Sequence, residues 1–230
     1  MGFSRGPKIV TDGLVLALDA ANVKSYPGSG TTWNDLSGNG NNGTLVNGPT
    51  FDSGNNGSIV FDGVDDYVNT NNNYNFTATS SFTVSCWVLQ KSAQWAGGNG
   101  PGYVGKSRAS THSWELGVLD GGDLNWEVRG GGSRVQARGS TPINKYFNAV
   151  GVYDNGSIAL YIDSILISTE TYNTSDGDFN ADRSVQIGRR ANDGSRVLDG
   201  KISNVQIYNR ALTSEEVLQN YNATKSRYGL

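Results

Sequence analysis

The sequence contains little of the chemistry on which many enzymes and disulfide-stabilised proteins depend, with one cysteine and one histidine in 230 residues. Because Cys86 is alone, no disulfide can form within the chain. Its alternation with Phe82 and Val84 predicts a buried structural thiol and not a nucleophile. A Ser-His-Asp triad would have to use His112, which stands at a predicted strand start where we expect a solvated side chain.

Glutamate is also scarce, which argues against a glycosidase. Retaining glycosidases need two carboxylates about 5 Å apart, which we expect at close spacing on one strand. The glutamates, none of which shows that spacing, are Glu115, Glu127, Glu170, Glu215 and Glu216. Strings at 2–6 and 38–43 match the nucleophile elbow and the dinucleotide-binding fingerprint, but neither joins a strand to a helix. The sequence therefore predicts no enzymatic activity.

Long apolar runs and a strong net charge are missing too. No segment approaches the roughly 20 apolar residues of a membrane span, and residues 1–10 lack the apolar core of a signal peptide. We expect a protein without a membrane partner that is made and folded in a reducing cytosol, or that is exported by a route that leaves no mark in the sequence. The net charge of −3 lacks the basic surplus of nucleic-acid-binding proteins. Local basic clusters are formed by Arg129, Arg134 and Arg138, and by Arg183, Arg189, Arg190 and Arg196. We interpret them as solvated charges that discourage pairing between strand edges.

What the chain has in quantity is glycine, asparagine and alternating apolar residues. Its 31 glycines indicate many turns, and period-two patterns such as Trp114-Leu116-Val118 recur in strand-length pieces. Asn155-Gly156 predicts a two-residue hairpin, Asp163-Ser164 a second turn, and a slip of parity near Ser203-Asn204 a β-bulge. The sequence predicts an all-β fold, a two-sheet antiparallel sandwich in one domain.

One short helix is predicted near the C-terminus, over 213–223. Thr213 and Glu216 have the spacing of a capping box, and Leu212 and Val217 that of a hydrophobic staple. We divide the chain into an N-terminal arm (1–12), the sandwich (13–223) and a C-terminal tail (224–230). Two long polar loops are expected, from 26 to 56 and from 91 to 108.

The first polar loop contains a candidate calcium site. Asp35, Ser37 and Asn39 alternate before a glycine, as in the first half of a calcium-binding loop. No glutamate completes an EF-hand, so further ligands would come from the FDGVDDY turn, with Asp66 the first choice and Asp62 and Asp65 as alternatives. The competing interpretation is that these side chains only hydrogen-bond to the backbone of their own turns.

The second polar loop contains the best candidates for an exposed aromatic platform that would bind sugar, Trp95 and Tyr103. A tryptophan that pins the loop to the sandwich is the alternative. Trp114 and Trp126 alternate in register with core residues and are expected to be buried, whereas Trp33 and Trp87 stay open.

Several segments, in order, resemble the laminin G-like branch of the concanavalin A-like lectin and glucanase superfamily. They are LVLALDA, TWNDLSGNGNNGTLVNGPTF, FDGVDDYVN, SFTVSCWVL, NAVGVYDNGSIALYIDSILI, VQIGRR and LDGKISNVQIYNRALTSEEV. The resemblance covers about residues 13–223. It implies a jelly-roll sandwich used more often for binding than for catalysis, with structural calcium frequent. Ser164 stands where relatives often have glycine.

Two terminal segments, SYPGSGTTWNDLSGNGNNGT and NATKSRYGL, are also similar to laminin G-like proteins of tailed phages of marine bacteria. This resemblance implies a non-catalytic protein located in the virion, as capsid decoration or fibre component. It would attach to other virion proteins through the arm at Met1 to Lys8 and the tail at Ser226 to Leu230, with glycan binding and homo-oligomerisation as further expectations. The alternative is a host-recognition adhesin or carbohydrate-binding module. A glycoside hydrolase is the second, disfavoured alternative.

Overall fold

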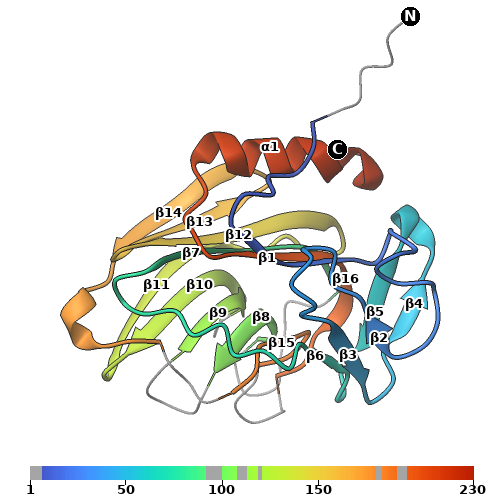
Figure 1. The fold of residues 1–230 in the computed structure, drawn as a ribbon, viewed down its shortest axis with the longest axis horizontal. Coiled ribbons are helices and arrows are strands. Elements are labelled where there is room, and N and C mark those ends of the chain that lie inside the picture. The colour runs from blue at the N-terminus through green and yellow to red at the C-terminus, as the bar shows by residue number, and fades with distance from the viewer. Residues whose placement is uncertain (1–6, 92–99, 108–112, 119–120, 180–182, 191–195) are drawn as a thin grey trace, which may run out of the picture.

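A computed structural model of the chain forms a sandwich of two antiparallel sheets (Figure 1). It describes residues 7–91, 100–107, 113–118, 121–179, 183–190 and 196–230. The predicted all-β sandwich is confirmed, and no helix in these ranges is long and apolar enough to cross a membrane.

The first sheet, sheet A, carries the C-terminal helix on its outer face. Its strands, in spatial order, are β14 (Ile165–Thr171), β13 (Ser157–Ile162), β12 (Tyr146–Asp154), β7 (Ser81–Gln90), β16 (Asp199–Tyr208), β5 (Ser58–Asp62) and β4 (Thr50–Asp52). β1 (Leu14–Asp19) also pairs with β16. The predicted bulge is confirmed, because the register of β16 against β7 shifts between Ile202 and Asn204.

The second sheet, sheet B, carries the candidate functional site. Its strands, in spatial order, are β11 (Ser133–Ser140), β10 (Asp123–Gly130), β9 (Ser113–Val118), β8 (Gly102–Ser107), β15 (Gln186–Ile187), β6 (Tyr67–Asn69), β3 (Gly43–Val46) and β2 (Thr32–Trp33). Three short 3₁₀ helices, η1 (Gly54–Asn56), η2 (Thr174–Asp176) and η3 (Lys225–Tyr228), complete the described elements. The predicted loop over 26–56 is thus wrong in part, since three short strands cross it.

The core lies between the sheets and is built by the alternating residues of each strand. Phe82 of β7 stacks on Phe76 and meets the rings of Trp114 and Trp126 from sheet B. All of these aromatic side chains are buried. Trp126 also donates a hydrogen bond to the Val152 carbonyl, 3.0 Å away in sheet A. The predicted burial of Trp114 and Trp126 is confirmed, and it turns the intervening residues of β9 and β10 away from the core.

Both predicted turns of sheet A are tight two-residue turns. Asn155 and Gly156 adopt positive φ values of 42° and 99° between β12 and β13, as a type I′ turn requires. Asp163 and Ser164 do the same at 51° and 66° between β13 and β14. Ser164 holds this conformation although it carries a Cβ, while Asp163 accepts a hydrogen bond from the Asn148 amide, which helps to fix the turn.

The C-terminal helix, α1 (Ser214–Thr224), begins at the predicted N-cap. The Glu216 amide donates to Thr213 Oγ1 at 3.3 Å, and Glu216 Oε2 accepts from the Thr213 amide at 3.0 Å. Arg210 also holds both carboxylate oxygens of Glu216, which ties the cap to the end of β16. Leu212 and Val217 are buried in one cluster, as the staple predicts.

Helix α1 lies across the outer face of sheet A (Figure 1). The predicted tail packs too, because Tyr228 of η3 stacks on Trp87 with ring centroids 4.1 Å apart. On the other side of α1, Val10 is buried and its amide donates to Asn220. The packed domain therefore extends at both ends beyond the predicted 13–223, and residues 1–6 lie outside the described part of the chain.

Replacing Thr213 by alanine should lower the free energy of unfolding by about 1 kcal/mol, since it removes the N-cap acceptor. The matched control is Ser214→Ala, the same loss of a hydroxyl one residue later. Urea denaturation of both variants measures the difference. Equal stability of the two would contradict the role of Thr213 as the cap.

Candidate functional site

The outer face of sheet B presents a row of residues in register, one from each strand, of which seven are polar and one is a glycine. Neighbouring members are paired in register from the first strand to the last. The row consists of Thr32, Thr44, Asn69, Gln186, Gly105, Glu115, Glu127 and Gln136. At a spacing of ~4.8 Å between strands, its seven steps span about 34 Å. Since each of these residues alternates with a core residue of its strand, the whole row faces away from the core.

Two glutamates stand opposite each other in the middle of this row. Glu115 of β9 and Glu127 of β10 are a register pair, and both side chains are buried. Arg190, which follows β15, lies between them, with Nε 2.9 Å from Glu115 and a terminal nitrogen 3.6 Å from Glu127. Two carboxylates and one guanidinium thus share a desolvated site.

Glu115 and Glu127 differ in the groups that surround them. Burial raises the pKa of Glu115 to about 7, and the charge of Glu127 adds to the rise, while Arg190 and Arg196 oppose it. Glu127 has more partners, since Oε2 accepts hydrogen bonds from Arg134 Nε and Gln136 Nε2, each at 2.7 Å. Glu115 therefore ionises near neutral pH.

Asn125 lies beside this pair, two residues before Glu127 on the same face of β10. Its side chain is 1% exposed. Within the described residues, neither its amide nitrogen nor its amide oxygen has a hydrogen-bond partner. A buried amide without a partner costs about 1–3 kcal/mol. Such a cost is expected where a ligand or an ordered water completes the site.

The predicted aromatic platform is wrong at Tyr103. This residue belongs to strand β8, is fully buried, and donates its hydroxyl hydrogen to Gln90 Oε1. The register of β8 against β9 shifts between Gly102 and Val104, and at this irregularity the Tyr103 ring lies inside the sandwich, 6.2 Å from the ring of Phe147. Trp95 lies outside the described residues. Trp33 and Trp87, left open by the sequence, are both buried, so polar groups are the main features of the described outer face of sheet B.

The predicted metal ligand Asp35 organises a turn instead. Its Oδ1 accepts from the amides of Ala17 and Ser37, and its Oδ2 accepts from the Ser37 hydroxyl and the Asn41 amide, at 2.7–3.0 Å. Asn39 donates to Ser37 Oγ and to the Leu14 carbonyl. This is the backbone-bonding alternative that the sequence left open.

Asp66 does not share a site with Asp35. The Asn41 amide that binds Asp35 precedes β3, and β3 runs antiparallel to β6 with Val46 opposite Tyr67. Asp66, which precedes β6, therefore lies at the far end of this strand pair. The combination of Asp35, Asn39 and Asp66 as one metal site is wrong because the pairing of β3 with β6 separates its members.

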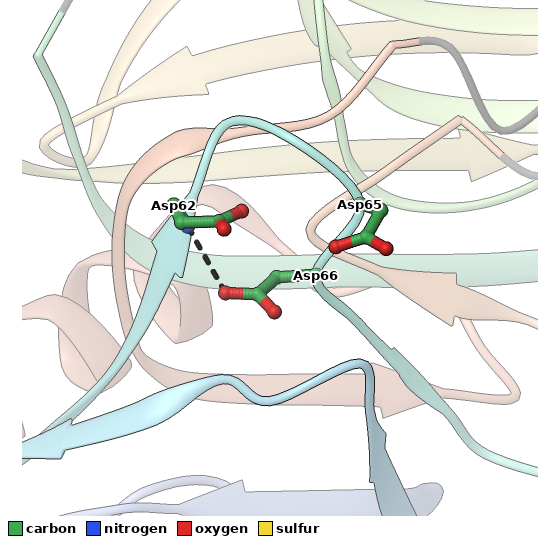
Figure 2. Close-up of side chains that lie close together, drawn as sticks. All are labelled: Asp62, Asp65 and Asp66. Carbon is green, nitrogen blue, oxygen red and sulfur yellow. Dashed lines mark hydrogen bonds between the residues drawn. The ribbon is translucent and has the colours of Figure 1, made fainter.

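Three aspartates do come together in the turn between β5 and β6 (Figure 2). One carboxylate oxygen from each of Asp62, Asp65 and Asp66 lies within 4.8 Å of the others. Burial raises the pKa of Asp66, and the neighbouring charges of Asp62 and Asp65 add to the rise, against a hydrogen bond from the Asp62 amide at 3.1 Å. Three oxygen ligands that repel one another suit a hard cation such as calcium.

Asn125, Arg190 and the pairing of Glu115 with Glu127 were not predicted from the sequence. The expected pattern was two carboxylates on one strand, whereas these two stand on neighbouring strands. The alternating segments 114–118 and 124–128 contained the signal, because a hairpin between them places 115 opposite 127.

A family model described as the concanavalin A-like lectin/glucanases superfamily (Laminin_G_3) matches residues 62–218. No curated protein is significantly similar to the chain in sequence. Among solved structures, the binding domain of Paraclostridial Mosquitocidal Protein 1 is similar, with a TM-score of 0.71 and 20% identity over 93% of this chain and 52% of that one.

Two further structures broaden the comparison. Domain 4 of AbnA, a GH43 extracellular arabinanase from Geobacillus stearothermophilus, in complex with arabinotriose, has a TM-score of 0.68 and 18% identity, covering 90% of this chain and 98% of that one. The binding domain of botulinum neurotoxin DC, in complex with rat synaptotagmin II, has a TM-score of 0.65 and 18% identity, covering 94% and 52%. The chain thus spans about half the length of the two toxin structures, and at these identities the likeness is one of fold.

Proposed function

Because the chain belongs to the concanavalin A-like lectin/glucanase superfamily, we propose that it is a non-catalytic binding module whose ligand is a glycan held on the outer face of sheet B. The observation that carries this proposal is Asn125, a buried amide with both polar atoms unpartnered among the described residues. Sugar hydroxyl groups donate and accept hydrogen bonds, so they match an amide that lacks both kinds of partner.

The similar structures support a binding role of this kind. Domain 4 of AbnA was solved with arabinotriose, and 98% of its length corresponds to this chain. The toxin structures are binding domains, one of them in complex with rat synaptotagmin II. A glycan is the ligand we favour here because the row on sheet B is polar and extends over about 34 Å, the shape of a track for a polymer.

Glycoside hydrolysis is the competing function, and the facing pair of Glu115 and Glu127 is the observation in its favour. A retaining mechanism needs one carboxylate free to attack the sugar. Glu127 instead accepts hydrogen bonds from Arg134 and Gln136, and it is fully buried. We therefore assign this pair to holding the site and expect no release of reducing ends from any bound polysaccharide.

The test is the variant Asn125→Leu, which has nearly the same shape but no polar atoms. If Asn125 serves the ligand, the variant should keep or raise its melting temperature, since a buried unpaired amide has been removed. Its affinity for glycans should fall about tenfold or more, as expected for one lost ligand hydrogen-bonding group. Affinity electrophoresis in gels with immobilised arabinan and other polysaccharides measures binding. Destabilisation with unchanged binding would refute the proposal.

We predict that calcium binds the turn of Asp62, Asp65 and Asp66 and stabilises the fold. A cation that binds only the folded protein raises the free energy of unfolding by about 2.7 kcal/mol at 100 times its Kd. The wild type should therefore melt several degrees higher in calcium than in chelator, and Asp66→Asn should lose this difference. The control Asp35→Asn should lower the melting temperature equally in both conditions. Wild-type melting curves that coincide in calcium and in chelator would exclude a calcium site at this turn.

For the setting of this module we propose the surface of a tailed-phage particle, where a host glycan would be its target. The support is the resemblance of two segments, SYPGSGTTWNDLSGNGNNGT and NATKSRYGL, to laminin G-like proteins of tailed phages. The N-terminal arm would attach this chain to other virion proteins. Deleting Met1 to Lys8 should leave the sandwich folded but abolish incorporation into particles. Incorporation of the truncated protein at normal levels would contradict this attachment.

A further inference from the structure

We propose that the glycan is acidic, and that its carboxylate or sulfate groups bind three arginines, Arg129, Arg134 and Arg138, which the buried carboxylate of Glu127 holds in place. The inference rests on the proposed function and names the class of its ligand. We refer to these three residues as the arginine cluster.

The pairing of β10 with β11 puts the arginine cluster on one face. Arg129 stands opposite Arg134, Glu127 opposite Gln136, and Asn125 opposite Arg138. Since alternate residues of a strand share a face, all of them point away from the core. Like charges directly opposite each other destabilise a sheet, so the pair of Arg129 and Arg134 needs a compensating group.

Glu127 supplies that compensation for the whole cluster. Its Oε2 accepts from Arg134 Nε at 2.7 Å, and its Oε1 lies 3.4 Å from a terminal nitrogen of Arg129. Gln136 extends the network, since its amide nitrogen donates to Glu127 and its amide oxygen accepts from Arg138. One buried carboxylate therefore fixes two guanidinium groups directly and a third through Gln136.

The positions of these groups leave charge and hydrogen-bond donors exposed. The side chains of Arg134 and Arg129 are 36% and 20% exposed, and Arg138 is exposed as well. Arg134 meets Glu127 through Nε, and no described residue accepts from its two terminal nitrogens. Three guanidinium charges face one carboxylate, on a chain whose net charge is −3. Such a fork-shaped, fixed set of donors suits carboxylate and sulfate oxygens.

Protection of a sheet edge, the role that the sequence suggested for these arginines, does not require the hydrogen-bond network of Glu127 and Gln136. Edge protection needs only solvated charge, whereas burying a carboxylate carries a desolvation cost of several kcal/mol. The buried Glu127 is explained better by the need to hold the arginines in one arrangement.

The experiment measures binding of the full chain to polygalacturonate, which carries carboxylates, to dextran sulfate, which carries sulfate esters, and to neutral arabinan. We expect at least one acidic polymer to bind about tenfold more tightly than arabinan, and that affinity to fall as sodium chloride rises from about 50 to about 300 mM. Whichever acidic polymer binds shows whether the charged group of the ligand is a carboxylate or a sulfate.

Variants test the arrangement of the cluster. Arg134→Gln and Arg138→Gln should each weaken acidic-polymer binding about tenfold, whereas Lys24→Gln, an exposed cation after β1, should not. Glu127→Gln makes the face more positive, so a merely electrostatic patch would bind more tightly. A positioning role predicts weaker binding. If Glu127→Gln fails to fold, Gln136→Leu should weaken binding in the same way, because it removes the link between Glu127 and Arg138 but keeps the contact of Glu127 with Arg134.

The outcomes separate the two proposals. Binding of arabinan as tight as that of the acidic polymers, without salt dependence, would overturn the acidic ligand and leave the glycan-binding module standing. Failure to bind any polysaccharide would overturn both. Binding of duplex DNA that matches the acidic polymers and is lost in the same variants would overturn the inference in favour of a nucleic-acid ligand. Tighter binding by Glu127→Gln would overturn the positioning role.

Discussion

Replacing Glu115 by glutamine should raise the free energy of unfolding at pH 8 by about 3 kcal/mol and leave it nearly unchanged at pH 4. The reason is that burial raises the pKa of this carboxyl from its ordinary 4.5 to about 7 in the folded protein. Each pH unit of such a difference corresponds to ~1.4 kcal/mol. Glutamine has the shape of the protonated acid and cannot ionise, so it avoids this cost.

The direction of the pH dependence follows from the same difference. The folded protein holds the proton on Glu115 more tightly than the unfolded chain does, so stability falls as pH rises from about 4.5 to about 7. Arg190 and Arg196 oppose this effect and Glu127 strengthens it. In Glu115→Gln, Arg190 keeps Glu127 as a partner at 3.6 Å. In this variant, the free energy of unfolding should therefore no longer show the decrease between about pH 4.5 and about pH 7 that Glu115 causes in the wild type.

Urea denaturation at pH 4, 6 and 8 measures these differences. The matched control is Glu170→Gln, the same substitution on the exposed strand β14, which should change the free energy of unfolding by less than ~0.5 kcal/mol. A Glu115→Gln variant that is less stable than the wild type at pH 8 would show that the ion pair with Arg190 outweighs the cost of burial.

The parts of the fold that sequence predicted well are those fixed by local chemistry. The cap at Thr213 and the turn at Asn155-Gly156 depend on hydrogen bonds and φ values within four residues, and both are confirmed. The two sheets follow from alternation, which needs only the period of a strand. The short strands within 26–56 were missed because each has only two to four residues, too few to show a period.

The site was harder to predict because its parts come from distant segments. The pairing of Glu115 with Glu127 was within reach of the hairpin pattern. Arg190, in contrast, reaches these glutamates only because β15 is inserted next to β8, which no local pattern indicates. Tyr103 was misplaced for the same reason, since its glycine-rich surroundings are typical of a loop and only the pairing of β8 with β9 makes them a strand.

The metal prediction failed in its grouping for a related reason. Asp35 and Asn39 have calcium-loop spacing, but spacing alone does not say whether a carboxylate faces a cation or its own backbone. The amides of Ala17 and Asn41 both reach Asp35 and occupy its oxygens. Asp62, Asp65 and Asp66 cluster because a four-residue turn forces them together, which the sequence did indicate as an alternative source of ligands.

Replacing Gly151 by alanine should lower the free energy of unfolding by about 3 kcal/mol, the upper range for overpacking a core. Gly151 lies in the middle of β12, and the Trp126 ring of the opposite sheet packs directly on it. A Cβ at this position would lie 2.3 Å from the ring atom Cδ2, so one of the two sheets must shift. Trp126 is also held by its hydrogen bond to Val152, which limits how far the ring can move away.

The shift would reach the candidate site, because Trp126 lies between Asn125 and Glu127 on β10. An outward movement of this strand would displace both residues, and glycan binding should weaken along with stability.

A double-mutant cycle with Trp126→Leu isolates the contact. Trp126→Leu alone should cost about 3–5 kcal/mol as a large core truncation. With the ring gone, the added methyl group of Gly151→Ala fills part of the space, so the double variant should be more stable than the sum of the two single effects by at least ~1 kcal/mol. Simple additivity, or a Gly151→Ala variant as stable as the wild type, would mean that the sheets are not held at this distance by the contact of Trp126 with Gly151.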